Sequence, residues 1–346
     1  MLETKLAGNN ARPVRRLMRW FLVSGCLGVL VAFTLANVTV VHAVNPAILP
    51  MLWPSSIAGP APAGGSVLSD IIRQQRDEGL TIVFYDHTLS AVSFNHRSKL
   101  KSVNLPFLIP AMTGAVSPDG MQVAGYVLNG PGRVILGIVR FDGSDPREYQ
   151  GIAPLDFCWS HDNQSIALTN ASGHRPSDME VVNVSTKDTR LIQANVEKRW
   201  HFNSQCWSPD DKQIVFENGG STQVYDIASG KIRDLVKGLN PTWSPDGEWI
   251  AFHRSETYYA IHPSGEGQKK LFHKTRAVSA LFWSPDSRFV AYVHQDFFAL
   301  DVEFYHLMVR RLDDGSEDWV ANGVSCCINY EWVKNPELLK QLKTAR

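Results

Sequence analysis

Residues 241–254 read PTWSPDGEWIAFHR, and residues 281–294 read LFWSPDSRFVAYVH. Related segments occur three more times, so that one serine of the motif recurs at Ser117, Ser160, Ser208, Ser244 and Ser284. The intervals between these serines are 43, 48, 36 and 40 residues. A repeat of about 40 residues with strand-like content is typical of β-propellers, in which each blade is a four-stranded sheet.

The local chemistry of the repeat predicts two strands joined by a tight turn. Ser-Pro-Asp-Gly suits a type I turn, because serine favours the first position, proline the second and glycine the fourth. After the turn, a short apolar run follows, as it does from Trp249 to Phe252, and such a run is consistent with a strand. A tryptophan precedes the serine at Trp159, Trp207, Trp243 and Trp283, and we expect each to fill space between neighbouring blades.

The two ends of the repeat region carry complementary halves of one unit. Residues 76–87 match the strand that follows the turn, with Gly79 at the glycine position, whereas the segment around Trp332 matches the strand that precedes the turn. Pairing of these strands would complete one blade and remove the exposed edges of an open array. We therefore expect an all-β fold, a six-bladed β-propeller closed by pairing of the C-terminal strand with the N-terminal blade.

These units resemble the WD40-like repeats of TolB-type six-bladed propellers, in which a WSPDG turn is followed by Ile-Ala-Phe. The resemblance covers about residues 76–335. It implies a fold that related proteins use as periplasmic scaffolds, as gating domains of peptidases and in a few lyases. The chain departs from the motif at His161 in place of proline and at Asn163, Asp211 and Ser287 in place of glycine. We expect these departures to weaken individual turns without changing the number of blades.

The N-terminus carries a separate signal. Residues 1–19 include Lys5, Arg12, Arg15, Arg16 and Arg19, and residues 20–44 contain no Asp, Glu, Lys or Arg. A bilayer core needs about 20 apolar residues of helix, whereas the apolar part of a signal peptide has roughly 7–15. The second stretch therefore favours one uncleaved transmembrane helix, a signal anchor. Residues 1–19 would be a basic cytoplasmic tail, and the rest of the chain would lie outside the cytoplasm, in the periplasm or extracellular space.

Two other fates of this segment stay open. Val41-His42-Ala43 is an acceptable cleavage site, and Val23-Ser24-Gly25-Cys26 resembles a lipobox, which would make Cys26 a lipidated N-terminus. Residues 45–66 are rich in Pro, Ala and Gly and predict a linker. Helical spacing of apolar residues predicts a short helix over 66–79, and residues 67–346 as a whole predict the propeller.

Composition and motifs limit the classes of function. Lys plus Arg and Asp plus Glu both number 34, whereas a nucleic-acid-binding protein usually has a basic surplus. The sequence contains no G-x-S-x-G, H-E-x-x-H, C-x-x-C or glycine-rich phosphate loop, so no catalytic residue is assigned. His174, His201, His253 and His294 are too scattered to predict a metal site, and we expect no metal or cofactor.

The longest units predict where a partner would bind. Because the motif turns all join first to second strands, they share one rim, and insertions in other loops emerge on the opposite face. Residues 170–178, 195–205 and 294–301 are such insertions. They carry the candidate binding residues His174, Arg175, Trp200, His201, Phe202, Phe297 and Phe298. Aromatic and Arg side chains are common anchors of protein interfaces, although these aromatics could instead fold back onto their own loops.

Four cysteines follow the apolar segment, namely Cys158, Cys206, Cys326 and Cys327. Disulfides are chemically permitted outside the cytoplasm, and four cysteines allow three pairings that the sequence does not distinguish. Cys158 and Cys206 occupy the same position in consecutive units, where burial as small apolar residues is the commoner fate.

Together these features favour a membrane-tethered, monomeric propeller outside the cytoplasm that binds a protein or glycan partner and catalyses nothing. The alternative hypothesis is a metal-dependent lyase or hydrolase with its site at the propeller channel. A purely structural role in an envelope complex would give the same sequence features as the first hypothesis.

Overall fold

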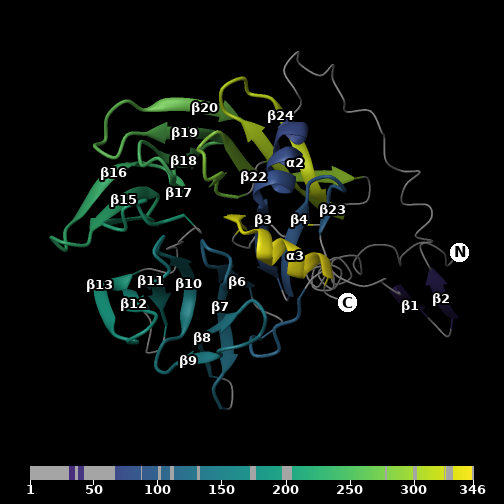
Figure 1. Cartoon of the computed structure of the whole chain (residues 1–346), viewed down its shortest axis with the longest axis horizontal. Coiled ribbons are helices and arrows are strands. Elements are labelled where there is room, and N and C mark those ends of the chain that lie inside the picture. The colour runs from purple at the N-terminus through teal and green to yellow at the C-terminus, as the bar shows by residue number, and fades with distance from the viewer. Residues whose placement is uncertain are drawn as a thin grey trace, which may run out of the picture. The chain divides into compact units, whose positions relative to one another are not determined.

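The structure, a computed structural model, divides the chain into two compact units, Met1–Ala61 and Pro62–Arg346. It is shown in Figure 1. The residues that it describes are 31–35, 38–42, 67–86, 88–99, 103–109, 113–130, 133–171, 177–196, 205–276, 279–298, 302–322, 324 and 330–344.

The described part of the first unit is not helical, in contrast to the membrane helix expected over residues 20–44. β1 (Val31–Leu35) and β2 (Val38–His42) form an antiparallel hairpin. Valine and threonine are frequent in this stretch, and both favour strands. The other residues of the expected anchor and the linker over 45–66 lie outside the described residues. No helix among the described residues is long and apolar enough to cross a bilayer.

The second unit is built from antiparallel sheets that follow one another around a common centre (Figure 1). In four of these sheets the strands lie in chain order. The first contains β10 (Pro154–Trp159), β11 (Ser165–Asn170), β12 (Ser177–Asn183) and β13 (Thr189–Val196). The second contains β14 (Gln213–Asn218), β15 (Ser221–Asp226) and β16 (Ile232–Lys237). The third contains β17 (Leu239–Trp243), β18 (Ile250–Arg254), β19 (Thr257–Ile261) and β20 (Lys269–His273). The fourth contains β21 (Phe282–Trp283), β22 (Phe289–Phe298), β23 (Val302–Arg311) and β24 (Glu317–Asn322).

The remaining strands of this unit form one eight-stranded sheet. They are β3 (Leu80–Asp86), β4 (Thr88–Ser93), β5 (Ser98–Lys99), β6 (Thr113–Val116), β7 (Gln122–Leu128), β8 (Val134–Arg140), β9 (Arg147–Tyr149) and β25 (Tyr330–Lys334). β25 pairs with β3, and Trp332 lies opposite Ile82, so the two chain segments expected to pair are neighbours. β3 also pairs with β6, with Tyr85 opposite Gly114.

This second pairing changes the number of separate sheets. It joins two repeat units that the sequence analysis counted as two blades into one continuous sheet. The described residues therefore form four separate blade-like sheets and one larger sheet, and the six separate blades expected from the sequence are not reproduced.

Two opposed glycines shape the larger sheet. Gly125 of β7 lies opposite Gly137 of β8, and Leu108 of the preceding segment packs over them. A Cβ atom on Gly125 would lie 3.0 Å from Leu108 Cδ1, and one on Gly137 would lie 2.2 Å from Val127 Cγ2. The absence of side chains at these two glycines therefore leaves room for the segment that carries Leu108 to pack against the sheet, where larger residues would clash.

The tryptophans of the repeat connect neighbouring units, as expected. The Nε1–H groups of Trp159, Trp207 and Trp332 donate to backbone carbonyls in the preceding unit, at Ala115, Cys158 and Phe282. Trp283 donates to the Thr242 hydroxyl at 3.2 Å. All four indoles are buried in apolar clusters between sheets, so each ring contributes both packing and a directed hydrogen bond to the junction that it fills.

The five motif turns repeat one internal pattern. Ser117 Oγ donates to Asp119 at 2.6 Å, and Asp119 accepts the amide of Met121 at 2.9 Å. The other four serine–aspartate pairs do the same at 2.5–2.7 Å. The carboxylate therefore fixes the turn.

The residues that replace the motif glycine link one turn to the preceding turn. Asn163, Asp211 and Ser287 keep the positive φ of a glycine, at 58°, 55° and 55°. Asn163 Oδ1 and Ser287 Oγ each accept one backbone amide of the preceding turn, at 3.4 and 3.3 Å. Asp211 accepts two, from His161 at 2.8 Å and from Asp162 at 2.9 Å. These departures from the motif thus add contacts between turns, which the sequence analysis did not expect.

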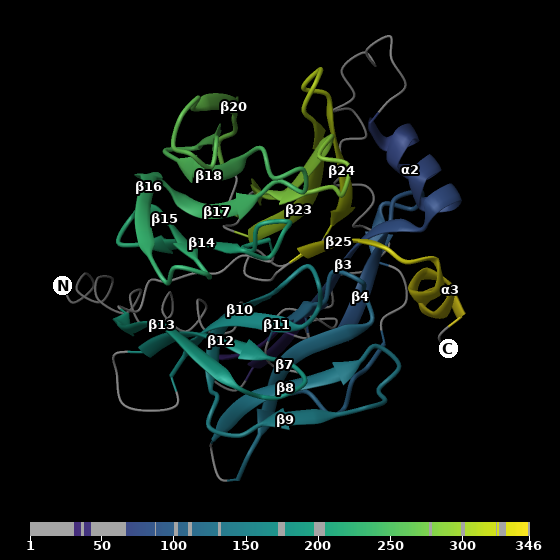
Figure 2. The same cartoon turned by 60° about the vertical axis from the view of Figure 1, so that its left-hand side comes forward.

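Two helices lie beside the junction of β25 and β3, where no motif turn exists. α2 (Val67–Glu78) confirms the helix expected over 66–79, and its Gln74 donates to Asp286 of one turn at 3.4 Å. Asn335 caps the N-terminus of α3 (Pro336–Thr344), because its side-chain oxygen accepts two amides of the first helical turn. Its side-chain nitrogen donates to the Asp119 carbonyl of another motif turn at 2.8 Å. Figure 2 shows the two helices side by side, and a surface cavity of about 400 Å³ separates them.

Candidate binding face

The turns and the insertions leave the sheets at opposite ends. Turn-to-turn hydrogen bonds place the motif turns on one rim. Because the strands are antiparallel, second strands end and third strands begin at the other rim. β11 ends there at Asn170, β12 begins at Ser177, and β22 and β23 meet between Phe298 and Val302. These strand ends, which flank two of the insertions expected from the sequence, therefore lie on the rim opposite the turns.

The structure describes little of the predicted site residues themselves. His174, Arg175, Trp200, His201 and Phe202 lie outside the described residues. Phe297 and Phe298 are the last two residues of β22, opposite Glu303 and Val302 of β23, and only their backbone is described. The strands that carry the insertions are thus placed on one face, and the seven side chains are not brought together by any described contact.

The β22–β23 hairpin is longer than its neighbours. Both strands have ten residues, whereas β21 pairs only as far as Ala291 and β24 only as far as His306. Beyond β21, the amide of Val293 donates to Ser279 Oγ at 2.8 Å, and the amide of Gln295 donates to the Arg276 carbonyl at 2.9 Å. These bonds support the base of the hairpin, and its end continues as a two-stranded ribbon.

Asn170 fixes the point where the first insertion leaves the sheet. It is 8% exposed, and its Oδ1 accepts the amide of Ala153 at 3.0 Å. Its Nδ2 donates to Glu180 of β12 at 3.1 Å. A buried polar residue that bonds both to β12 and to the residue preceding β10 gives the insertion a rigid base. The sequence offered no signal for this role, because Asn170 reads only as the end of a strand.

Three exposed leucines lie on this face and were missed by the sequence analysis. Leu128 ends β7, Leu155 is the second residue of β10, and Leu239 begins β17, with 63%, 47% and 39% of each residue exposed. Each stands at a strand end that belongs to the rim opposite the turns. Since each one fits the alternation of its strand, the sequence alone predicts burial.

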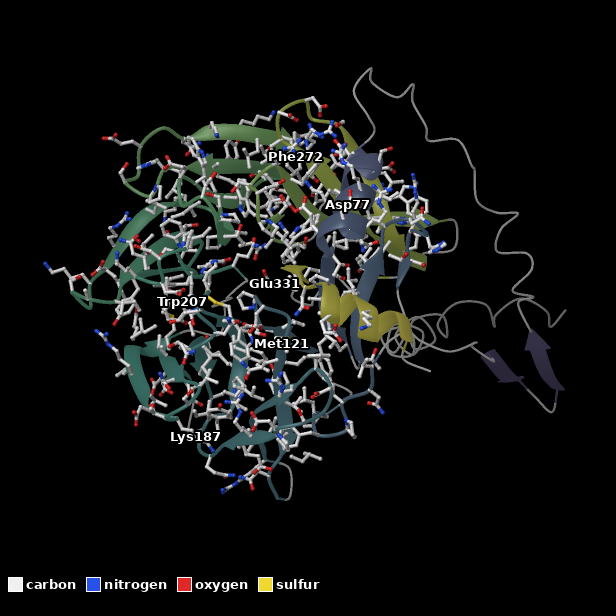
Figure 3. The ribbon with its side chains drawn as sticks, in the orientation of Figure 1. Asp77, Met121, Lys187, Trp207, Phe272 and Glu331 are labelled. Atoms are coloured by element: carbon white, nitrogen blue, oxygen red, sulfur yellow. A yellow bond between two sulfur atoms is a disulfide. The ribbon has the colours of Figure 1, made fainter. Side chains whose placement is uncertain are left out.

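A polar side chain links first strands that are not adjacent. Gln205 is 7% exposed; its Nε2 donates to the Trp283 carbonyl at 2.9 Å and its Oε1 accepts the Trp283 amide at 2.7 Å. The carbonyl of Gln205 also accepts the Trp243 amide at 2.9 Å. Trp207, two residues after Gln205, is labelled in Figure 3 and lies toward the centre of the unit. Gln205 therefore holds three sheets together near the centre of the unit.

Cys158 and Cys206 form a disulfide between neighbouring units, with their Cα atoms 6.4 Å apart. Both residues are fully buried, so the expectation of burial is met, and the sequence analysis left their pairing open. Cys326 and Cys327 lie outside the described residues. The bond crosslinks the two units from whose strands the first two insertions leave.

A charged cluster joins the third and fourth sheets. Glu317 Oε1 accepts from Lys274 at 2.6 Å, and its Oε2 accepts from Tyr292 at 2.8 Å and from Arg310 at 2.9 Å. Burial alone would raise the pKa of Glu317, but these donors outweigh it and lower that pKa below its ordinary value. Burial and the Glu317 charge raise the pKa of the Tyr292 phenol. All four groups have a partner, so the cluster stabilises a sheet junction and offers no open catalytic position.

The histidines near this junction do not form a metal centre in the described part of the chain. His253 lies against the Tyr258 ring at 4.9 Å, and burial lowers its pKa. His294 lies opposite His306, which shares a 2.7 Å hydrogen bond with Asn322. No group of three or more His, Cys, Asp or Glu side chains among the described residues is arranged to hold a metal ion.

Comparison with known proteins supports the fold. No protein-family model matches the chain. An uncharacterized protein of Agrobacterium fabrum is 30% identical over 153 residues, which make up 41% of this chain and 50% of that relative. The chain thus matches about half the length of this curated relative.

Two solved structures resemble this chain. TolB from Acinetobacter baumannii gives a TM-score of 0.56 at 17% identity, covering 79% of this chain and 74% of that chain. A TolB-type protein from Agrobacterium tumefaciens gives a TM-score of 0.52 at 18% identity, covering 73% of this chain and 98% of that chain. At such low identity the likeness establishes the fold alone: the chain has a TolB-like β-propeller fold.

Proposed function

We propose that this protein is a membrane-tethered β-propeller that binds a protein or glycan partner outside the cytoplasm and has no catalytic activity. The observation that carries the proposal is the separation of two faces. Short, mutually bonded turns form one rim, and the long connections leave the other. A rigid scaffold that presents variable loops on one face is a common architecture for binding.

The proposed propeller has six blades and is closed by the β25–β3 pair. In this reading the eight-stranded sheet counts as two blades, β25-β3-β4-β5 and β6-β7-β8-β9. Six apolar clusters of described residues lie between successive units, which is the number that a closed ring of six blades requires. The propeller is proposed to act as a monomer.

The proposed location outside the cytoplasm is supported by the disulfide and by the N-terminal sequence. Protein disulfides persist in oxidising compartments and are rare in the cytosol. Residues 20–44 contain no charged side chain, and five basic residues precede them. Those basic residues would stay in the cytoplasm and orient the anchor. Carbonate extraction of membranes, followed by protease treatment of intact and opened cells, tests both the anchor and its orientation.

Partner binding is proposed to involve Trp200, Phe202, Phe297 and Phe298, together with His174, Arg175 and His201. The test compares capture of partners from native membranes by the wild type and by a variant with the four aromatic residues replaced by alanine. The variant is expected to lose the partner and to keep wild-type circular dichroism. Undiminished capture by the folded variant would reject this site. Stoichiometric metal in the purified chain would instead favour the lyase or hydrolase alternative.

A further inference from the structure

β13 differs from the other outer strands of the described sheets. It has eight residues, whereas β5, β9, β16, β20 and β24 have two, three, six, five and six. In the described part of the chain β13 pairs with β12 only, so its other edge has no strand beside it. A long outer strand presents unpaired backbone donors and acceptors.

The other long outer strands carry the charges that usually protect such an edge. β16 contains Arg233, Asp234 and Lys237, β20 begins with Lys269-Lys270, and β24 begins with Glu317-Asp318. β13 reads TRLIQANV and has a single charge, at Arg190. Its Leu191 is 53% exposed. Charged side chains and short length normally prevent edge pairing, whereas β13 is the longest of these outer strands and carries only one charge.

The register shows which backbone groups of β13 point outward. The amide of Asn183 donates to the Asp188 carbonyl at 2.9 Å, which sets the start of the β12–β13 ladder. Inward and outward groups alternate along the regular part of this ladder, from Thr189 to Leu191, so the backbone groups of Arg190 point toward β12 and those of Leu191 point outward. Beyond Leu191 the register shifts twice. Leu191 thus combines an exposed apolar side chain with free backbone groups at one position.

We infer that the outer edge of β13 binds an extended segment of a partner protein by β-strand addition. This inference rests on the proposed function and specifies how the partner is held. The segment is apolar at alternate positions, to pack beside Leu191, and it is flanked by acidic residues. The described residues 187–196 carry Lys187 and Arg190 against Asp188 and are net positive, which disfavours a second copy of the same edge and favours acidic flanks.

A synthetic peptide tests the inference with the full-length chain. The probe is fluorescein-labelled Glu-Glu-Thr-Val-Thr-Val-Thr-Val-Glu-Glu, and binding is measured by fluorescence anisotropy. A peptide with proline at both central positions cannot form the ladder, and a peptide with lysine flanks reverses the charge. We expect the first peptide to bind and the other two to bind at least tenfold more weakly.

A matched pair of variants locates the binding. Leu191→Asp and Gln268→Asp add the same charge at exposed positions of different sheets, the second directly before the outer strand β20, and unchanged circular dichroism shows that both fold. Leu191→Asp is expected to weaken peptide binding at least tenfold, and Gln268→Asp less than twofold. Absence of binding to the wild type, or equal binding by Leu191→Asp, would overturn the inference. Wild-type dimers that Leu191→Asp dissociates, without peptide binding, would assign the edge to a second copy and overturn it as well.

The same variants separate this inference from the proposed function. If Leu191→Asp still captures the native partner and the peptide binds nowhere, the binding function stands and the β13 edge is excluded. If the peptide binds as expected but the wild type captures no partner from native membranes, the edge is competent and the proposed function fails.

Discussion

Replacing Asp211 by glycine restores the consensus turn and is nevertheless expected to destabilise the protein. Asp211 occupies the glycine position of its turn with a φ of 55°. A comparison with the motif alone predicts a gain in stability, because glycine adopts positive φ without backbone strain. Relief of that strain amounts to about 1 kcal/mol. The structure predicts the opposite sign, because the Asp211 carboxylate accepts two amides of the preceding turn.

The magnitude follows from the geometry of those bonds. The two amides lie 2.8 and 2.9 Å from separate oxygens of a side chain that is 20% exposed. A hydrogen bond to a charged group contributes about 1.5–3 kcal/mol, and the exposure argues for the lower end. Two such bonds, less the relief of backbone strain, leave a net loss of roughly 2 kcal/mol. For a domain of this size that corresponds to a fall in Tm of about 3 °C.

The assay is thermal unfolding of the purified chain, followed by tryptophan fluorescence and circular dichroism. Asp211→Asn keeps one strong acceptor and is expected to lose about half as much stability as Asp211→Gly. Ser287→Gly is the matched control, because Ser287 occupies the same turn position but accepts a single amide at 3.3 Å, so a change near zero is expected. A higher Tm for Asp211→Gly than for the wild type would refute the role assigned to the carboxylate.

Three further outcomes are expected. Glu317→Gln should lower stability by roughly 2 kcal/mol near neutral pH. Because the pKa of Glu317 is lowered in the folded state, its stabilising contribution is present above the ordinary pKa of 4.5 and is lost as pH falls through the folded-state pKa. Urea titrations of wild type and variant should therefore converge in acid, and a gap that stays constant with pH would contradict this. Replacing Cys158 and Cys206 by alanine removes a crosslink across 48 residues and should cost up to about 4 kcal/mol, measured by urea unfolding with and without reductant, while reductant should leave the variant unchanged. Gly79→Ala should destabilise more than Gly143→Ala, because both have positive φ but only the first would place a Cβ 2.7 Å from the Pro336 nitrogen; equal losses in Tm would show that strain alone matters.

Much of the fold was predictable because its determinants are local. The Ser-Pro-Asp turn with a preceding tryptophan specifies two strands and the bend between them within a dozen residues, and periodicity then repeats the assignment. The segment around Trp332 was recognised by the same pattern, which placed β25 next to β3. The helix over Val67–Glu78 followed from its apolar spacing.

The features that escaped prediction depend on contacts distant in sequence. The β3–β6 contact that merges two units involves Tyr85 and Gly114, and no local pattern marks either residue. In the sequence, Asn163 and Asp211 are simply departures from the motif glycine. Their role becomes visible only in the fold, where their side chains accept backbone amides of the preceding turn. α3 had a weak signal that was overlooked, since Asn335 followed by Pro336 is a common start of a helix. The binding residues predicted in the insertions stay a prediction.

Several connections join the sheet that carries the first insertion to the next sheet along the chain. The sheet that begins with β10 and the sheet that begins with β14 share the disulfide, the two Asp211 bonds and the indole bond of Trp207. The first two insertions and the β13 edge all belong to the first of these sheets or leave from it. Ordering of a flexible surface reduces affinity, so a platform that is already rigid confines this cost to the loops themselves. If that is the role of these connections, removing the disulfide should weaken partner binding by less than removing the loop aromatics, because the disulfide acts only through the position of the loops.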